Sequence, residues 1–259
     1  MVREKTLKKP LRKIRDTGNP QNGTPQPDAE DMSARSAVDV IRDHILNLSL
    51  APGARIDDRL LMERFGMGRT PAREAFSRLA AEGFIIIQRN KGAFVRPLDI
   101  QQVREFFDAY CASERLVGFF CETRDPDLAD DLRAIEASYE AVSKDAMYLD
   151  MTRLNSEFHK RIAAATGNEY ISDFAHRLYN HARRLSYFIY LMPGERRPGL
   201  KGMQESIKGH HEDIITAIET QNNEELIRVL TQHAELFHHW IMEAIGAIRG
   251  LQAPLPIKM

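Results

Sequence analysis

Apolar residues recur every three or four positions along most of the chain, which predicts mainly helical structure. The first three predicted helices are short. One ends at "LAPG", and the second begins at an Asp57/Asp58 cap and stops at Gly66. The third begins in "TPAREA", where Thr70 can cap and Pro71 occupies the first helical position, and it is expected to run to about Glu82.

Two short strands follow the third helix. The segments "FIIIQ" and "AFVRP" have the composition of strands, and "RNKG" between them is a turn. Three helices, the last two joined by a tight "GMG" turn and followed by a hairpin, predict a winged helix-turn-helix. In that arrangement the helix after the turn, Thr70–Glu82, lies in the major groove of DNA, and the hairpin reaches the backbone or the minor groove.

Polar and basic side chains gather on the two parts of this unit that would meet DNA. Some lie near the amino-terminal end of the predicted recognition helix, where side chains contact base edges or phosphates. The others form the tip of the predicted wing. We expect the following residues to contact double-stranded DNA: Arg69, Thr70, Arg73, Arg89, Asn90 and Lys91.

From residue 98 onwards the chain continues as one helix after another. Breaks such as "TGN" and "TQNN" separate these helices, and no strand signal or repeat period interrupts them. The predicted helices span residues 99–122, 126–144, 147–166, 169–192, 203–220 and 223–249. We therefore predict a mostly α protein, in which a winged helix-turn-helix precedes an all-α six-helix bundle.

Charge divides the chain at the same place. Residues 1–97 carry 18 Lys and Arg against 12 Asp and Glu, whereas the other 162 residues carry 18 against 25. The amino-terminal part therefore suits a polyanion, and the remainder does not. We expect a disordered basic tail over residues 1–32, a DNA-binding domain over 33–97 and a helical domain over 98–250.

Composition also indicates the compartment. No apolar run approaches the roughly 20 residues that a membrane span needs, and the basic start is not followed by the apolar segment of a secretory signal. Cys111 and Cys121 are too few for a disulfide framework, which favours free thiols in a reducing compartment. We therefore expect a cytoplasmic protein without a membrane partner.

Three histidines lie on the apolar faces of three predicted helices. His159 follows Asn155 by four residues, so the two side chains project together. His211 and His233 share the apolar faces of two later helices. Imidazoles from different helices can converge on one divalent ion, with zinc or nickel as candidates. The alternative is that each is a core histidine, satisfied by a carbonyl group or a water.

The segment "APGARIDDRLLMERFGMGRTPAREAFSRLAAEGFIIIQRNKGAFV" resembles the DNA-binding domain of GntR-type regulators. The helical domain is similar to the FCD effector-binding and dimerisation domain of the FadR subfamily, and its six helices point to the VanR-like branch. This resemblance implies a homodimeric transcriptional regulator, most often a repressor, that binds a palindromic operator and responds to a small-molecule effector. The family's DNA-contacting arginines fall on Arg59, Arg69 and Arg73, and its wing-tip contacts fall on Arg89 and Asn90.

The resemblance also assigns the histidines a role. The FCD metal-binding pattern, D-x-x-x-H followed by two later histidines, falls on Asn155, His159, His211 and His233. Asn155 stands where the family usually has Asp, and its amide oxygen can coordinate but brings no charge. The ion would then keep its full positive charge, which predicts weaker metal binding and favours an anionic effector that completes the coordination shell.

Two further residues are candidates for effector binding. Tyr110 stands where many FCD members have an Arg that can hold an effector carboxylate. His181 lies on the inner seam of its helix, where it would either line the pocket or have a structural role.

Two other functions compete with that of a ligand-responsive regulator. Three histidines and an open coordination position also describe a metal-dependent hydrolase. Its weakness is the missing general base, because Glu157 points away from the face of Asn155 and His159. A constitutive dimeric DNA-binding protein is the other alternative, and neither metal nor metabolite would change its DNA affinity. The regulator is favoured, and an enzyme is not expected, because only a regulator uses both parts of the chain.

Overall fold

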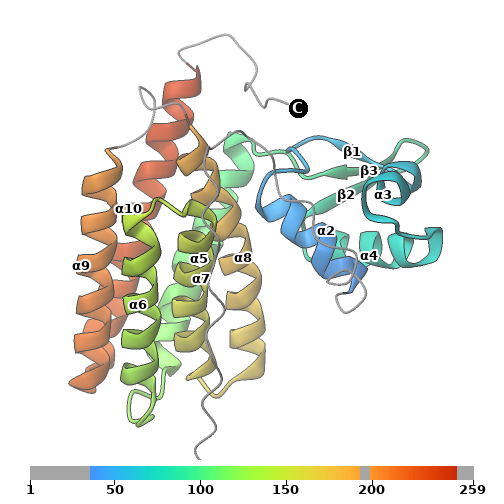
Figure 1. The fold of residues 1–259 in the computed structure, drawn as a ribbon. Helices are drawn as coiled ribbons and strands as arrows, with labels where there is room; N and C mark the ends of the chain where they lie inside the picture. Colours follow the sequence, from blue (N-terminus) through green and yellow to red (C-terminus); the bar gives the residue numbers. More distant parts are fainter. Residues whose placement is uncertain (1–35, 193–198, 250–259) are drawn as a thin grey trace, which may run out of the picture.

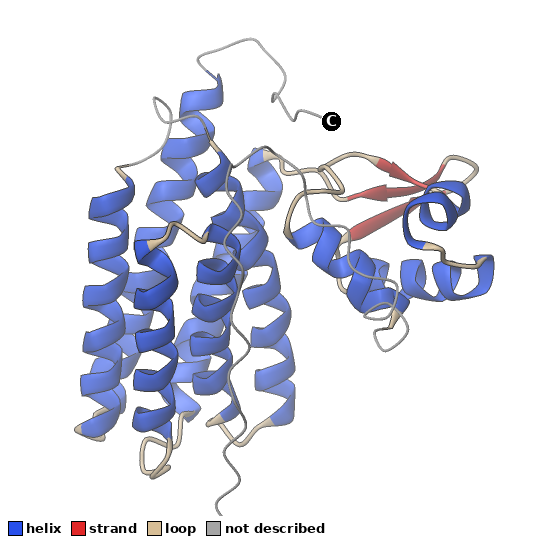
Figure 2. Cartoon of the chain, in the orientation of Figure 1, coloured by secondary structure: helices blue, strands red, loops and turns tan. Residues whose placement is uncertain are grey.

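The computed structural model describes residues 36–192 and 199–249. The predicted basic tail, residues 1–32, lies outside these ranges. A bundle of long helices stands beside a smaller unit that combines short helices with a sheet (Figure 1). The smaller unit contains all the strands of the described chain, so the protein is mostly α (Figure 2).

The smaller unit is a winged helix-turn-helix. Its sheet is antiparallel with the order β1-β3-β2, and β2 and β3 form the predicted hairpin. The elements are α2 (Ala37–Leu46), β1 (Arg55–Ile56), α3 (Asp58–Phe65), α4 (Arg69–Ala81), β2 (Ile85–Gln88) and β3 (Gly92–Val95). The strand β1 was not predicted, because two residues are too few to show the alternation that marks a strand.

Local chemistry explains where these helices begin and end. Of the two aspartates expected at the start of α3, Asp57 is the cap, because its side chain accepts a hydrogen bond from the Leu60 amide. Gly66 ends α3 in the left-handed region, with a φ of 64°. The expected Thr70 cap of α4 is wrong: the helix begins at Arg69 with Gly68 as its N-cap. Pro71 still lies in the first turn, where its missing N–H group has no intrahelical partner to lose.

In the described part of the chain the bundle consists of six helices, close to the predicted boundaries. They are α5 (Ile100–Phe120), α6 (Leu128–Lys144), α7 (Tyr148–Ala164), α8 (Glu169–Leu191), α9 (Leu200–Glu219) and α10 (Asn223–Arg249). The bundle and the winged helix have separate apolar cores. Among residues 36–192 and 199–249, no helix is both long and apolar enough to cross a bilayer.

Gly118 allows the two helices α5 and α10 to approach closely. A Cβ atom built at this glycine would lie 3.0 Å from the Cα atom of Ile227. Contacts that short require one of the backbones to move. The closest part of the α5–α10 packing therefore depends on the absence of a side chain at Gly118.

Candidate functional site

The predicted DNA contacts on the helices are all exposed. Arg69, Thr70 and Arg73 lie on the first turns of α4 with solvent-accessible side chains. Within the described chain, neither Arg69 nor Arg73 has an acidic partner within salt-bridge distance. Arg59 on α3 is 82% exposed, and its Nε atom donates to Glu63 at 2.7 Å. A surface ion pair of this kind is weak enough to exchange for a phosphate group.

The wing presents its polar tip to solvent as well. Arg89, Asn90 and Lys91 are exposed between β2 and β3. Asn90 has a φ of 62°, a conformation that Asn adopts more readily than most residues. The Lys91 amide donates to the Gln88 carbonyl at 3.1 Å and closes the turn. The hairpin thus holds its basic tip in a defined turn.

The structure brings the three predicted histidines together inside the bundle. His159 comes from α7, His211 from α9 and His233 from α10. They are 1%, 0% and 5% exposed. One ligand atom from each lies within 4.8 Å of the others. Sites of this kind hold transition metals, so the cluster is a candidate metal centre.

Unpartnered nitrogen atoms support this assignment. Neither ring nitrogen of His159 forms a hydrogen bond with any described residue, and the same holds for His211 Nε2 and His233 Nδ1. Buried polar atoms are rarely left unsatisfied, and a bound ion would satisfy these. The three residues therefore fit a divalent metal better than they fit three isolated core histidines.

Two buried carboxylates that the sequence analysis missed stand behind the histidines. Glu136 Oε2 lies 2.6 Å from His211 Nδ1, which leaves Nε2 of that ring available for an ion. Glu114 is fully buried, and its Oε2 atom lies 3.7 Å from His159 Nδ1. Each glutamate is a charged residue on an otherwise apolar stripe of its helix, and that signal could have identified it.

The protonation of the cluster suits metal binding. Burial lowers the pKa of His211, even though the bond with Glu136 acts in the opposite direction. Burial also lowers the pKa of His233 to well below its usual range, and the neighbouring His159 and His211 add to this effect. Both rings are therefore neutral at physiological pH, which is the form that binds a metal.

A small cavity of about 30 Å³ adjoins the cluster. Its lining combines apolar and aromatic side chains with a few polar groups, as small-molecule sites do. The lining residues are Asn155, Ser186, Ile189, Tyr190, Met203, Ile207, His233, Phe237 and Trp240. His233 and Asn155 thus belong to both the predicted metal set and the cavity wall. The Oδ1 atom of Asn155 has no hydrogen-bond partner among the described residues.

The two effector candidates do not line this cavity. Tyr110 is 2% exposed, and its ring packs against Phe106 and Tyr179. His181 lies at the contact with the winged helix, where its Nε2 atom is 2.9 Å from the carbonyl oxygen of Glu82. His181 therefore has the structural role that the sequence analysis gave as the alternative.

Comparison with protein families matches both parts of the chain. Residues 33–95 match the family "Bacterial regulatory proteins, gntR family", and residues 99–236 match the FCD domain. The chain is 25% identical over 217 residues to the HTH-type transcriptional repressor RspR of Escherichia coli (strain K12), covering 81% of this chain and 87% of the relative. It is 27% identical over 199 residues to the HTH-type transcriptional repressor GlaR of the same organism, covering 74% and 88%.

Solved structures share the fold. A transcriptional regulator GntR from Rhodococcus sp. RHA1 superposes with a TM-score of 0.63 at 18% identity, covering 83% of this chain and 98% of that one. McbR/YncC of E. coli superposes with a TM-score of 0.61 at 17% identity, covering 76% and 91%. At this level of identity the likeness concerns the fold alone.

Proposed function

The chain belongs to the FCD-domain regulators of the gntR family, and we propose that a small anionic ligand controls its operator affinity. In this proposal the ligand is bound at a metal ion in the helical domain. Membership of the family makes the protein a DNA-binding transcriptional regulator rather than an enzyme. We also propose that it acts as a repressor, as its relatives RspR and GlaR are named. The observation that carries the proposal is the cluster of three buried histidines beside the cavity.

In this proposal, His159, His211 and His233 hold the ion, and Asn155 supplies an amide oxygen. Zinc is the first candidate because its sites favour imidazole ligands in a tetrahedral set, and nickel is the second. The ion would polarise and fix a ligand group that reaches it through the cavity.

The preference for an anion follows from charge. Three neutral imidazoles and an amide leave the ion with its full positive charge on the cavity side. Glu114 and Glu136 stand behind the histidines, and neither lines the cavity. A carboxylate that enters the cavity would therefore meet the ion on the side where neither of these glutamates lies, beside the hydroxyl groups of Ser186 and Tyr190.

The hydrolase alternative loses support from the geometry of Glu157. This carboxylate is 45% exposed and forms an ion pair with Arg153 at 2.9 Å. It does not line the cavity. A general base must reach the reacting group directly or through one water. Glu157 therefore does not supply the base that a hydrolytic site needs.

We propose further that the regulator is a homodimer on a palindromic operator, because a two-fold protein matches two half-sites. The carboxyl-terminal turns of α5 carry an exposed apolar cluster that suits such an interface: Leu116, Phe119 and Phe120 are 41%, 65% and 45% exposed. Sedimentation of the wild type and of Phe119→Glu checks this. The substitution should shift the equilibrium from dimer towards monomer. If the wild type and Phe119→Glu are both monomers, the proposal is contradicted.

One experiment tests the whole proposal. Genomic DNA fragments bound by the purified protein are selected once in the presence of a chelator and once with added zinc. We expect a short palindrome whose affinity depends on zinc, and the genes beside it would nominate candidate acids for titration. Binding to a palindrome that neither zinc nor an acid changes would instead indicate the constitutive alternative.

A further inference from the structure

The helix α8 contacts both ends of the wing hairpin. His181 Nε2 donates a hydrogen bond to the carbonyl oxygen of Glu82 at 2.9 Å, three residues before the start of β2. One turn further along, Arg184 Nη2 donates to the carbonyl oxygen of Arg96 at 2.7 Å, immediately after β3. A single helix of the bundle therefore holds the two points between which the hairpin runs.

The His181 contact is closely packed. Its ring stacks on Phe84, with centroids 4.2 Å apart and planes inclined by 21°. Gly83 between Glu82 and Phe84 has a φ of +84°, and a Cβ atom there would lie 3.4 Å from His181 Nε2. Glycine at this position thus permits both the left-handed turn and the approach of the ring.

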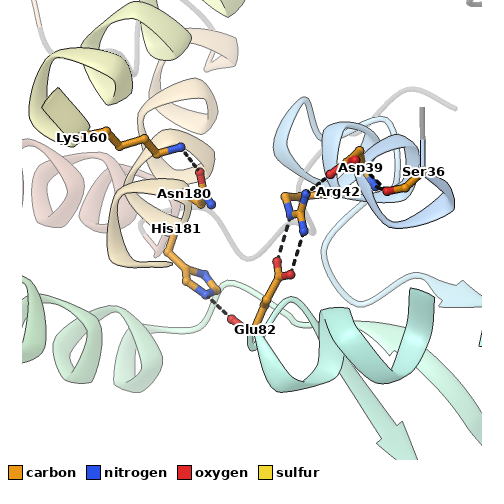
Figure 3. A network of polar contacts seen from close by, with 7 residues as sticks. All are labelled: Ser36, Asp39, Arg42, Glu82, Lys160, Asn180 and His181. Atoms are coloured by element: carbon orange, nitrogen blue, oxygen red, sulfur yellow. Dashed lines mark hydrogen bonds and ion pairs between the residues drawn. The ribbon is translucent and has the colours of Figure 1, made fainter. Parts of the chain in front are cut away.

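Glu82 also joins the recognition helix to α2. It is the C-cap residue of α4, and its carboxylate accepts hydrogen bonds from Arg42 Nε at 2.9 Å and Arg42 Nη2 at 2.7 Å. Figure 3 shows that Arg42 and His181 approach Glu82 from two different helices. The end of the recognition helix is therefore the point where α2, α4 and α8 meet.

Arg184 is an unusual residue for a core position. It is 1% exposed, its Nε atom has no hydrogen-bond partner among the described residues, and no carboxylate forms a salt bridge with it there. Burial and the nearby Arg96 lower the pKa of its guanidinium to about 10. A buried cation without an anionic partner lowers stability, because nothing offsets the cost of removing it from water. Arg184 therefore contributes a fixed hydrogen bond to the backbone at Arg96 rather than stability.

The same helix lines the ligand cavity. Ser186, Ile189 and Tyr190 of α8 form part of the cavity wall. Ser186 follows His181 by five residues, which corresponds to about 7.5 Å along the helix axis. A ligand that shifts α8 or changes its tilt therefore acts on the hairpin contacts without an intermediate element.

We propose that His181 and Arg184 are positioning residues for DNA recognition: they set the orientation of the recognition helix and wing on the bundle, and they transmit the state of the cavity to the DNA-binding surface. The transmission rests on the proposed function, because it requires a metal or ligand at the cavity. The positioning stands without it, because the contacts are present in the protein alone.

The first test compares five variants of the full chain with the wild type. His181→Ala and Arg184→Met remove the contacts, His181→Gln and Arg184→Lys keep a donor, and Arg177→Met alters an exposed residue of the same helix as the control. The operator affinity is measured with zinc and with a chelator. Zinc affinity is followed through the fluorescence of Trp240, which is the protein's only tryptophan and lines the cavity.

We expect zinc to change the operator affinity of the wild type by about fivefold or more. His181→Ala and Arg184→Met should lose most of this change while they bind zinc as the wild type does. The donor-keeping variants should recover part of it, and Arg177→Met should leave it intact. Variants without the contacts that keep the full zinc response would overturn the transmission through α8, as would a wild type that binds zinc without any change in operator affinity.

A second measurement separates this inference from the proposed function. Hydrogen exchange is followed at the hairpin ends without metal, for the wild type and for His181→Ala combined with Arg184→Met. Faster exchange around Phe84 and Arg96 together with weaker operator binding supports the positioning role even if zinc never binds. Unchanged exchange and unchanged operator affinity would refute it.

Discussion

At the scale of single residues, the environment of each histidine sets its role. His211 and His233 are buried beside other imidazoles with unpartnered ring nitrogens, which suits them to an ion. His181 is packed against Phe84 and donates to a carbonyl group, which suits it to holding a backbone in place. Histidine thus has two roles in this protein, as a candidate metal ligand and as a donor to a backbone carbonyl group, and the sequence alone does not distinguish them.

Glu136→Gln should lower zinc affinity by about 10- to 100-fold, because the amide can accept the bond from His211 but brings no negative charge. A fluorescence titration of Trp240 measures this. The matched control is Glu140→Gln on the same helix, which only loses an ion pair with Lys208 at the surface. If both variants bind zinc alike, Glu136 has no part in the metal centre.

Asn155→Asp should strengthen zinc binding, because a carboxylate adds a negative charge to the proposed ligand set. The same change should weaken the binding of an anionic ligand to the zinc-loaded protein. Calorimetric titration of zinc, followed by acetate as a simple carboxylate probe, measures both effects. Equal zinc affinity in Asn155→Asp and wild type would place Asn155 outside the coordination shell.

The stability of the protein should fall in acid partly through His181. Burial, opposed by its bond to Glu82 but reinforced by Arg184 and Arg96, lowers its pKa to about 4. Below the ordinary pKa of about 6.5 the unfolded chain takes up a proton that the folded chain resists, so the free energy of unfolding decreases as the pH falls towards 4.

Urea unfolding at neutral pH and at about pH 4.5 tests this, with His181→Gln as the reference that cannot titrate. The wild type should lose roughly 1 to 3 kcal/mol more than His181→Gln, at about 1.4 kcal/mol for each unit of difference in pKa. Equal losses in the two proteins would show that His181 is not held in its neutral form.

At the scale of helices, α8 contacts three different parts of the molecule. Ala175 and Tyr179 face the bundle core, Ser186 and Tyr190 face the cavity, and His181 faces the winged helix. A helix that packs against three surfaces cannot shift at one of them without disturbing its contacts with the other two. This is the physical reason to expect that ligand binding and DNA binding are coupled through α8.

Two glycine substitutions should have opposite effects on stability. Gly118→Ala places a Cβ atom 3.0 Å from Ile227 and should destabilise the protein by about 1 to 3 kcal/mol, because α5 and α10 must separate. Gly209→Ala on α9 meets no atom within 4 Å and should stabilise it by about 0.5 to 1 kcal/mol through better helix propensity. Thermal unfolding of both variants measures the contrast, and equal shifts in the same direction would contradict it.

At the scale of the whole molecule, the chain separates a basic DNA-binding unit from an acidic ligand-binding unit. The division follows the two apolar cores, which the hairpin and its contacts with α8 connect. Positive charge concentrated in one unit attracts DNA to that unit and leaves the other free to bind a ligand.

Arg69→Ala should weaken specific operator binding by roughly 1 to 3 kcal/mol, because the exposed guanidinium at the start of α4 has no acidic partner among the described residues and can contact a base. Arg78→Ala is the matched control on the same helix, because Arg78 lies in the last turn of α4, away from the end that is expected to contact bases. Fluorescence anisotropy with labelled operator measures both. Unchanged affinity in Arg69→Ala would mean that α4 does not enter the major groove as proposed.

The sequence by itself determined the order and nature of the elements, because helix periodicity, caps and turns are properties of neighbouring residues. It also brought out the three histidines, since each shares a stripe with apolar side chains. It did not reveal the two-residue strand β1 or the helix start at Arg69, where local preferences are weak.

Only the tertiary structure decided which distant groups meet. His211 bonds to Glu136, which lies 75 positions away, and His181 bonds to Glu82, which lies 99 positions away. No local pattern records such pairs, because they arise only when the helices pack. The folded chain alone therefore shows that buried carboxylates support the histidines and that α8 joins the cavity to the recognition helix.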